Sequence, residues 1–339
     1  ERVRVMQQGR TALAVAAMLF SASCISWGAS ADIGEEQGQE PVYYVAVGAV
    51  FRDEDAFLQE WIEFHLCAGV EHFFLYNHES SSKDHEAILA PYVEAGLVTL
   101  EQALCDIHCQ VPTYQALLQH HGSKCVWLAL IDIDEFLYPA EPSTLSLSTV
   151  LKSYEDHAAG VCIHWIIYGS SNHIEAPRGL LIDNFDQRSP TIHPVVKTIA
   201  QPRRIARAWA HNHEYISGWT AVNERFEPVP FDTASGEPLS ELPTPSASLL
   251  RINHYRVKSI SHARWRYVRD STFRLNDFEN PDVFPDTEEQ HEEWIKRWDA
   301  GGMTDQSAAV QYGDCVREGL QRRGGQRGFM TEVRPHLEF

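Results

Sequence analysis

The strongest constraint on the fold is the alternation of short apolar segments with amphipathic ones between residues 42 and 133. Residues 43–51, YYVAVGAVF, are typical of a buried strand, and the next segment spaces its apolar side chains as one face of a helix does. A strand–helix series predicts a parallel sheet with right-handed crossovers, whose ligands bind at the carboxyl ends of the strands. The further segments of the series are apolar 71–77, 97–101 and 125–133, and amphipathic 81–96 and 113–122.

Beyond residue 146 the pattern predicts a helix near 147–158, strands at 160–169 and 248–259, and a helical segment from 262 onward. The Pro- and Ser-rich segment 226–248 predicts an exposed loop, either a tolerated surface insertion or a flap over substrate. The resulting domain prediction comprises a signal peptide or signal anchor (1–31), a linker (32–41), an α/β domain (42–275) and a helical C-terminal extension (276–339).

The charge balance limits the partners that the chain can bind. Its 339 residues include 28 Lys and Arg against 47 Asp and Glu, which gives a formal net charge of -19. This argues against nucleic acid as a partner, because phosphate binding needs clustered Lys and Arg. A polyanionic ligand would need a local basic patch or a bound metal.

The first 31 residues have the layout of a targeting segment. Arg2, Arg4 and Arg10 precede an apolar stretch at 11–20, and small residues follow, ending at 29–31. A cleaved signal peptide and a single-pass membrane anchor both remain open, although Ser and Gly weaken the second half as a spanning helix. We expect the secretory pathway: the Golgi lumen or membrane (single-pass type II), or secretion if the segment is cleaved.

Six cysteines lie beyond this segment. An even number permits disulfides in an oxidising compartment, but their pairing cannot be deduced. The cluster CDIHC (105–109) resembles half a zinc site, yet no second pair at zinc-binding spacing completes it, so a disulfide or plain packing is favoured. The six are Cys67, Cys105, Cys109, Cys125, Cys162 and Cys315.

The segment CVWLALIDIDEFLYP (125–139) carries a buried strand into Asp132, Asp134 and Glu135. Burying an unpaired carboxylate is costly, so we expect a cation or a solvated cleft there. On an extended segment Asp132 and Asp134 would share one face, where their repulsion favours a divalent cation, Mn²⁺ or Mg²⁺. Such an ion can stabilise a departing diphosphate in nucleotide-sugar transfer.

Four segments, 45–77, 91–100, 127–139 and 252–259, together resemble glycosyltransferase family 92 and its close relatives of GT-A fold. The resemblance covers roughly residues 42–270. It implies an α/β, Rossmann-like domain with a mixed, mostly parallel sheet flanked by helices. It also implies that Asp132 and Asp134 form the metal and nucleotide-sugar motif and that His254 is a third metal ligand. Imidazole with carboxylates suits Mn²⁺, although a single His is by itself more often structural.

The resemblance also implies residues that hold the nucleotide. Arg52 and Glu54 match positions after the first strand, with Asp53 where relatives carry Asn. Asn77 stands where relatives carry Asp-Asn, so a carboxylate is missing. These departures put the identity of the nucleotide in question. Gln110 and Tyr114 also match positions before the fourth strand, where both could simply pack.

Cations and polar residues further along complete the predicted site. Lys197, Arg203 and Lys258 are candidate diphosphate partners, or solubilising surface residues. The segment 165–181 resembles the acceptor side of the family. There Ser170, Ser171 and His173 could bind sugar hydroxyls, although a tight turn capped by serines explains them too. The candidate bases are the carboxylates Glu175, Asp186 and Glu135.

These features predict a metal-dependent enzyme that moves a hexose, galactose by the resemblance, from a UDP-sugar to a glycan hydroxyl with inversion. Besides the metal site, Asp134 is assigned a catalytic part. One alternative is a lumenal carbohydrate-binding protein on a degenerate transferase fold. Another is a metal-dependent phosphohydrolase, which would carry its Asp pair on the first strand and Thr where this chain has Phe136.

Overall fold

The computed structural model describes residues 40–103, 105, 109–141, 146–232, 237–266 and 287–324. The predicted targeting segment 1–31 and linker residues 32–39 lie outside these ranges, as do 267–286 and 325–339 near the predicted C-terminal extension. Within the described part of the chain, no helix combines the length and the apolar character needed to span a membrane.

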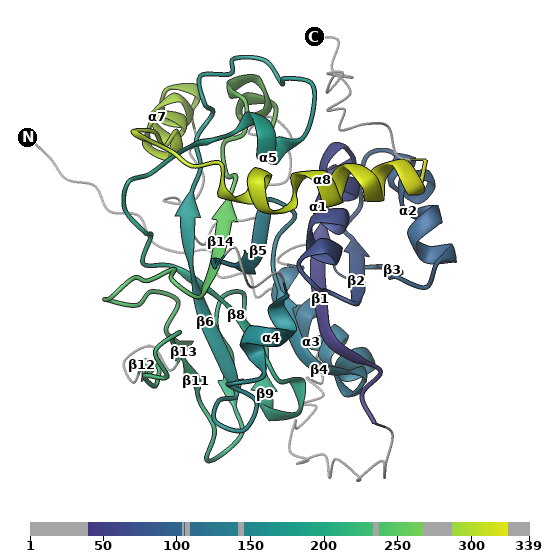
Figure 1. Ribbon diagram of the computed structural model, residues 1–339, viewed down its shortest axis with the longest axis vertical. Helices are drawn as coiled ribbons and strands as arrows, with labels where there is room; N and C mark the ends of the chain where they lie inside the picture. The colour runs from purple at the N-terminus through teal and green to yellow at the C-terminus, as the bar shows by residue number, and fades with distance from the viewer. Residues whose placement is uncertain are drawn as a thin grey trace, which may run out of the picture. The chain divides into compact units, whose positions relative to one another are not determined.

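Nine strands of the described residues form one mixed sheet in the order β3-β2-β1-β4-β8-β6-β14-β5, with β11 beside β6 (Figure 1). β8 runs antiparallel to β4 and β6, and β5 antiparallel to β14, while the other pairings are parallel. The bounds are β1 Tyr43–Phe51, β2 His72–Asn77, β3 Val98–Gln102, β4 Cys125–Leu130, β5 Glu135–Pro139, β6 Gly160–Ile167, β8 Val196–Ala200, β11 Ala221–Val222 and β14 Leu250–His254.

Short pairs of strands and a set of helices surround this sheet. The pairs are β7 (Gln187–Arg188) with β15 (Met303–Thr304), β9 (Ile205–Arg207) with β10 (Glu214–Tyr215), and β12 (Phe231–Asp232) with β13 (Glu237–Pro238). The helices are α1 Asp55–Cys67, α2 Asp84–Glu94, α3 Gln110–His121, α4 Leu147–Leu151, α5 Leu181–Asn184, α7 Glu288–Trp298 and α8 Ser307–Arg322, with 3₁₀ turns η1 Gly122–Lys124 and η2 Pro202–Arg204.

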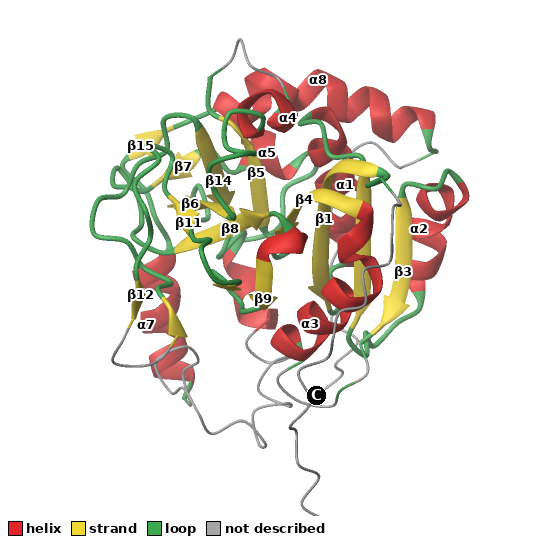
Figure 2. Cartoon of the chain, turned by 90° about the horizontal axis from the view of Figure 1, so that it is seen from below, coloured by secondary structure: helices red, strands yellow, loops and turns green. Residues whose placement is uncertain are grey.

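The alternation of side chains along β1 explains why helices cover both faces of the sheet. Val45 and Val47 belong to the large apolar core that includes side chains of α1 and α8. Ala46, between them, packs with Tyr114 and Leu117 of α3 in a second core. Because neighbouring side chains of a strand point to opposite faces, an uninterrupted apolar strand needs cover on both. Figure 2 shows α8 and α3 on opposite sides of the sheet.

The topology confirms the predicted α/β fold class, a mixed and mostly parallel sheet flanked by helices. The predicted strands and helices of residues 43–130 are all present. The helix predicted near 147–158 is shorter, since α4 ends at Leu151. β5 and β8 were not predicted, because each is only five residues long and follows a polar segment.

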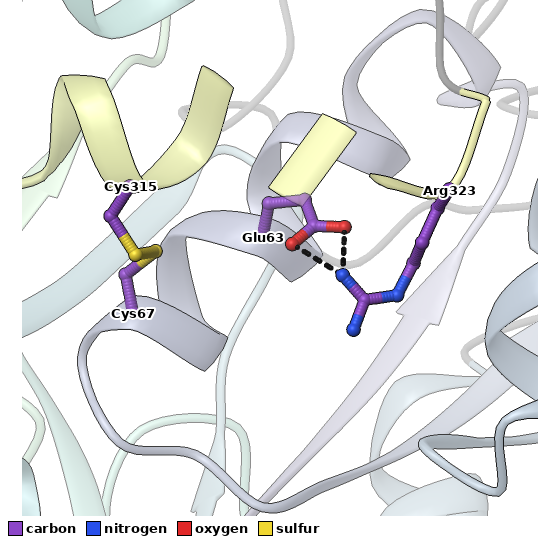
Figure 3. The surroundings of a disulfide bond; sticks show 4 residues. All are labelled: Glu63, Cys67, Cys315 and Arg323. Atoms are coloured by element: carbon purple, nitrogen blue, oxygen red, sulfur yellow. Dashed lines mark hydrogen bonds and ion pairs between the residues drawn. A yellow bond between two sulfur atoms is a disulfide. The ribbon is translucent and has the colours of Figure 1, made fainter. Parts of the chain in front are cut away.

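A disulfide between Cys67 and Cys315 joins the end of α1 to α8 (Figure 3). In the same figure, Glu63 of α1 accepts hydrogen bonds from the Arg323 guanidinium, at 2.7 and 2.9 Å. A Cβ atom at Gly319 would collide with the Glu63 carboxylate, so glycine allows the two helices to approach closely. The C-terminal helix is therefore held firmly against the domain.

The other cysteines of the described residues form one disulfide and two free thiols. Cys105 and Cys109 are joined, in agreement with the favoured interpretation of the CDIHC cluster. Cys125 and Cys162 are free and buried. Residues 106–108 lie outside the described residues.

Candidate active site

Pairing between β5 and β14 brings together two of the three predicted metal ligands, Asp134 and His254. Because β4, β6 and β14 run in the same direction, their carboxyl ends meet at one edge of the sheet. β14 lies antiparallel to β5 with His254 opposite Glu135. The imidazole of His254 therefore lies beside the turn that joins β4 to β5, although more than a hundred residues separate them in sequence.

The expectation that Asp132 and Asp134 share one face of an extended segment was wrong. β4 ends at Leu130, and the chain turns through residues 133–134 before β5 begins. The N–H of Glu135 donates to the carbonyl of Asp132 at 3.0 Å within this turn. The turn is needed because β5 leaves β4 to pair with β14, and it directs the two aspartates to different partners.

Asp134 contacts a histidine and an arginine. Its Oδ1 lies 3.5 Å from His254 Nε2, and its Oδ2 accepts a hydrogen bond from Arg266 at 3.0 Å. Burial opposes ionisation, but His254, Arg266 and Lys258 outweigh it and hold the pKa of Asp134 well below its usual range. Burial lowers the pKa of His254, and the neighbouring Asp134 carboxylate only partly offsets this effect.

Asp132 belongs to a second cluster, built around a buried lysine. Lys197, with a side chain 1% exposed, lies 3.1 Å from Asp132 Oδ2 and 3.7 Å from Glu135 Oε2. Gln110 donates to Asp132 Oδ1 at 2.8 Å. Burial would lower the pKa of Lys197, but Asp132 and Glu135 raise it above its usual value, so the lysine keeps its charge. Burial, with repulsion from both aspartates, raises the pKa of Glu135.

The cations expected opposite the three carboxylates are therefore supplied in part by the chain itself. Lys197 lies at Asp132 and Glu135, and Arg266 lies at Asp134. The pattern at 125–139 could indicate that positive charge is needed, but not whether it comes from side chains or from a metal.

The donor atoms at the strand ends suit a divalent metal in part. Asp134 and His254 form a carboxylate–imidazole pair of the kind that Mn²⁺ accepts. Asp132 could join them only by releasing Gln110 or Lys197, which engage its two oxygens. Within the described residues, no three His, Cys, Asp or Glu side chains are already arranged to hold a metal ion. Asp134 and His254 can thus supply two ligands of a metal site. Asp132 could supply a third only after its side chain changes partners.

The residues predicted to hold the nucleotide lie at the same edge. Arg52 and Glu54 follow the end of β1, and Glu54 Oε2 lies 3.7 Å from the buried Lys258 ammonium. Lys258 also contributes to the low pKa of Asp134, which places it near the carboxylates. Asn77, at the end of β2, hydrogen-bonds Gln102 and Ser80. Nucleotide binding by these residues stays a prediction.

The predicted acceptor residues form a turn after β6. Ser170 Oγ accepts from the Asn172 N–H, Ser171 Oγ accepts from the Gln187 N–H, and both residues 171 and 172 have a positive φ. His173 Nε2 lies 3.2 Å from the Asn184 carbonyl. The structural alternative, a turn capped by serines, is thus present, and a role in acceptor binding is untested.

The candidate bases differ in their surroundings. Glu175 is exposed, whereas Glu135 is fully buried and therefore poorly placed to reach an acceptor. Asp186 accepts hydrogen bonds from Gln187 and Gln306, at 3.0 and 3.2 Å.

Several residues of the site were not found from the sequence. Arg266 lies in a helical segment with no distinguishing pattern. Trp165 lies 4.4 Å from the His254 ring and 5.4 Å from that of His211, between ring centroids. The HNH pattern at 211–213 is the signal that could have drawn attention to His211.

The sheet, with acidic residues and a histidine at the carboxyl ends of its strands, places the chain in the class of α/β proteins that bind ligands at this edge. The particular family follows from a family model, Glycosyltransferase family 92, that matches residues 43–290, more than half of the chain. The chain belongs to glycosyltransferase family 92.

Two curated plant proteins illustrate the relationship. A glycosyltransferase family 92 protein of Ricinus communis is 23% identical over 125 residues, which cover 37% of this chain and 22% of that protein. Galactan beta-1,4-galactosyltransferase GALS2 of Arabidopsis thaliana is 29% identical over 109 residues, which cover 30% of this chain and 21% of that protein. The matches therefore span only about a fifth of the relatives' own length.

Among solved structures, S. aureus TarS 1-349 in complex with UDP matches with a TM-score of 0.34 and 11% identity, covering 74% of this chain and 69% of that one. A likeness this remote has no bearing on the substrate.

Proposed function

We propose that this chain is a metal-dependent glycosyltransferase that transfers a hexose, galactose, from a UDP-sugar to a glycan hydroxyl with inversion. The observation that carries the proposal is the contact between Asp134 and His254 at the carboxyl ends of the strands, in a chain of family 92. The galactan beta-1,4-galactosyltransferase among its relatives supports galactose as the sugar and a galactan as the glycan.

In this proposal, Asp134 and His254 hold a divalent ion, Mn²⁺ or Mg²⁺, with Asp132 as a third ligand after it leaves Lys197 or Gln110. The bound ion would supply electrostatic stabilisation of the departing diphosphate. Arg266 and Lys258 are cations beside the same carboxylate and would add positive charge there. Lys197 would hold Asp132 in place until the donor arrives.

The reaction is a single displacement. An acceptor oxygen forms a bond to the anomeric carbon while the bond from that carbon to the diphosphate oxygen breaks, and the electron pair of this bond leaves with UDP. The acceptor proton passes to a carboxylate base. Glu175 and Asp186 remain the candidates, and Glu175 is the more exposed of the two.

Replacement of one carboxylate tests the proposal. UDP release with UDP-galactose and a β-1,4-galactan oligosaccharide should require Mn²⁺ or Mg²⁺ and should fall at least ~100-fold in Asp134→Asn, because a metal ligand is lost. The matched control is Asp314→Asn, since the Asp314 side chain is fully exposed. Turnover that needs no metal, or an equal loss in both variants, would contradict the proposal.

The two alternatives are separable by binding measurements. A carbohydrate-binding protein should bind free oligosaccharide but show no UDP release. A phosphohydrolase should not distinguish uridine from other nucleosides. The structure offers the phosphohydrolase no support, because the Asp pair follows the fourth strand in chain order and Phe136 stands two residues beyond Asp134.

We also propose that the mature chain acts in the secretory pathway, in the Golgi or outside the cell. The two disulfides among the described residues support this, because such bonds persist in oxidising compartments. N-terminal sequencing of the secreted and membrane fractions would show whether residues 1–31 are removed.

A further inference from the structure

A cavity of about 320 Å³ lies beside β10 and β11, where residues of the loop 212–220 line it. β11 pairs with Gly160 and Val161 at the start of β6, whereas His254 pairs with Ile167 at its end. At about 3.3 Å per residue, these two ends of β6 are roughly 23 Å apart. The part of the cavity beside β11 therefore lies at the other end of β6 from His254.

One buried donor in the cavity wall has no partner among the described residues. His213 is 2% exposed, and its Nδ1 accepts a hydrogen bond from the Trp209 N–H at 3.3 Å. Nε2 must then carry the proton in the neutral ring, and it has no hydrogen-bond partner. Burial lowers the pKa of His213 to about 4, so the ring is neutral near pH 7. A buried N–H without an acceptor is costly.

The loop that carries His213 is fixed by its neighbour. Asn212 Oδ1 accepts hydrogen bonds from the hydroxyls of Thr198 and Tyr215 and from the N–H of His213, at 3.3, 3.1 and 2.8 Å. The cavity wall is thus preorganised, which reduces the entropy lost when a ligand binds.

Aromatic side chains form another part of the wall. Trp219 is partly exposed and lines the cavity with Tyr215. The guanidinium of Arg204 lies 3.3 Å from the centre of the Trp219 ring system, so it covers one face and holds the indole in place. An indole fixed in this way can offer its remaining surface to the C–H groups of a sugar.

The charges of the residues that line the cavity disfavour an anionic ligand. Glu214 contributes a carboxylate, and no Lys or Arg is among the described residues that line the cavity. Aromatic surface, an imidazole donor, an amide and a carboxylate together suit a neutral, polyhydroxylated ligand.

We propose that this cavity is a second carbohydrate subsite, which binds a neutral oligosaccharide stretch of the acceptor away from its reacting hydroxyl. That the ligand is the acceptor rests on the proposed transferase function. Carbohydrate binding in the cavity does not depend on that function. The loop that carries His213 connects the cavity to the proposed catalytic site. Its His211 lies against Trp165, which in turn lies next to His254.

Calorimetric titration of the full chain with β-1,4-galactotetraose and with cellotetraose, without donor, tests the subsite. Trp219→Ala should weaken binding of the preferred tetrasaccharide on the order of tenfold, and Trp219→Phe should weaken it less, because part of the ring surface remains. Ile216→Ala is the matched control, since Ile216 is exposed on the same loop and does not line the cavity. UDP release with methyl β-galactoside as the acceptor should be unchanged in Trp219→Ala.

Absence of tetrasaccharide binding to the unaltered chain, or equal affinities of Trp219→Ala and Ile216→Ala, would overturn the subsite. Thermal unfolding of each variant establishes that it is folded. If Trp219-dependent binding is found but no UDP is released by any variant, the transferase proposal fails while the subsite stands.

Discussion

At the scale of single residues, Lys197 is the most consequential side chain that the sequence left ambiguous. In an acidic chain, a lysine on a polar segment is usually exposed. Here the side chain of Lys197, on β8, is only 1% exposed and lies between Asp132 and Glu135. A buried ammonium persists only when carboxylates compensate its desolvation. The same residue thereby offsets part of the negative charge of Asp132 and Glu135.

The Lys197→Met variant tests how much this buried ion pair contributes to stability. The variant keeps most of the side-chain volume but leaves Asp132 and Glu135 without their cation, so we expect the free energy of unfolding to fall by about 3–5 kcal/mol. Urea unfolding measures the change, with the exposed Lys152→Met as control. The double variant Lys197→Met, Glu135→Gln should lose less than the single variant. An unfolding midpoint equal to that of Lys152→Met would refute the role of the buried ion pair.

At the scale of elements, α1 holds several parts of the domain together. Its Glu60 accepts hydrogen bonds from the N–H groups of Leu181 and Ile182 at the start of α5, at 2.7 and 3.0 Å. Burial raises the pKa of Glu60 to about 7, although the two hydrogen bonds and nearby Arg317 oppose the rise. The orientation of α5, and of Asp186 just beyond it, thus depends on one buried carboxyl group.

This gives a prediction of pH dependence. Between pH about 4.5 and about 7 the folded chain holds a proton on Glu60 that the unfolded chain has lost, so this contribution to stability decreases as pH rises through that range. The change amounts to about 3 kcal/mol. The free energy of unfolding at pH 5 and pH 8 should therefore differ less in Glu60→Gln than in the unaltered chain. Glu94 is exposed, so the Glu94→Gln variant should keep the full difference in the free energy of unfolding between the two pH values. Identical pH dependence in all three would contradict the assignment.

At the scale of the whole molecule, the sequence was most informative where local pattern decides structure. Apolar strands buried on both faces, such as β1, are long enough to identify, and their order predicts the sheet. The turn at 133–134 was not predictable, because it depends on β5 pairing with a strand more than a hundred residues away. The same long-range register brings His254 to Asp134, which the family resemblance anticipated and periodicity alone could not.

Arg266 is a residue of the site that the sequence pattern does not indicate. Nothing in the helical segment 260–266 distinguishes this arginine from a solvated one, yet it donates to Asp134 at 3.0 Å. Conversely, the serines of the turn after β6 were noticed for their chemistry, and in the structure they satisfy backbone groups. Residue type suggests what a side chain can do, whereas tertiary packing selects the partner.

The central claim, that His254 and Asp134 hold a metal ion that binds the nucleotide, is tested most directly by calorimetric titration of UDP with and without Mn²⁺. We predict that UDP binds tightly only with Mn²⁺, that His254→Ala abolishes this dependence, and that the exposed control His157→Ala retains it. UDP binding of equal affinity with and without the metal, unchanged in His254→Ala, would contradict the account.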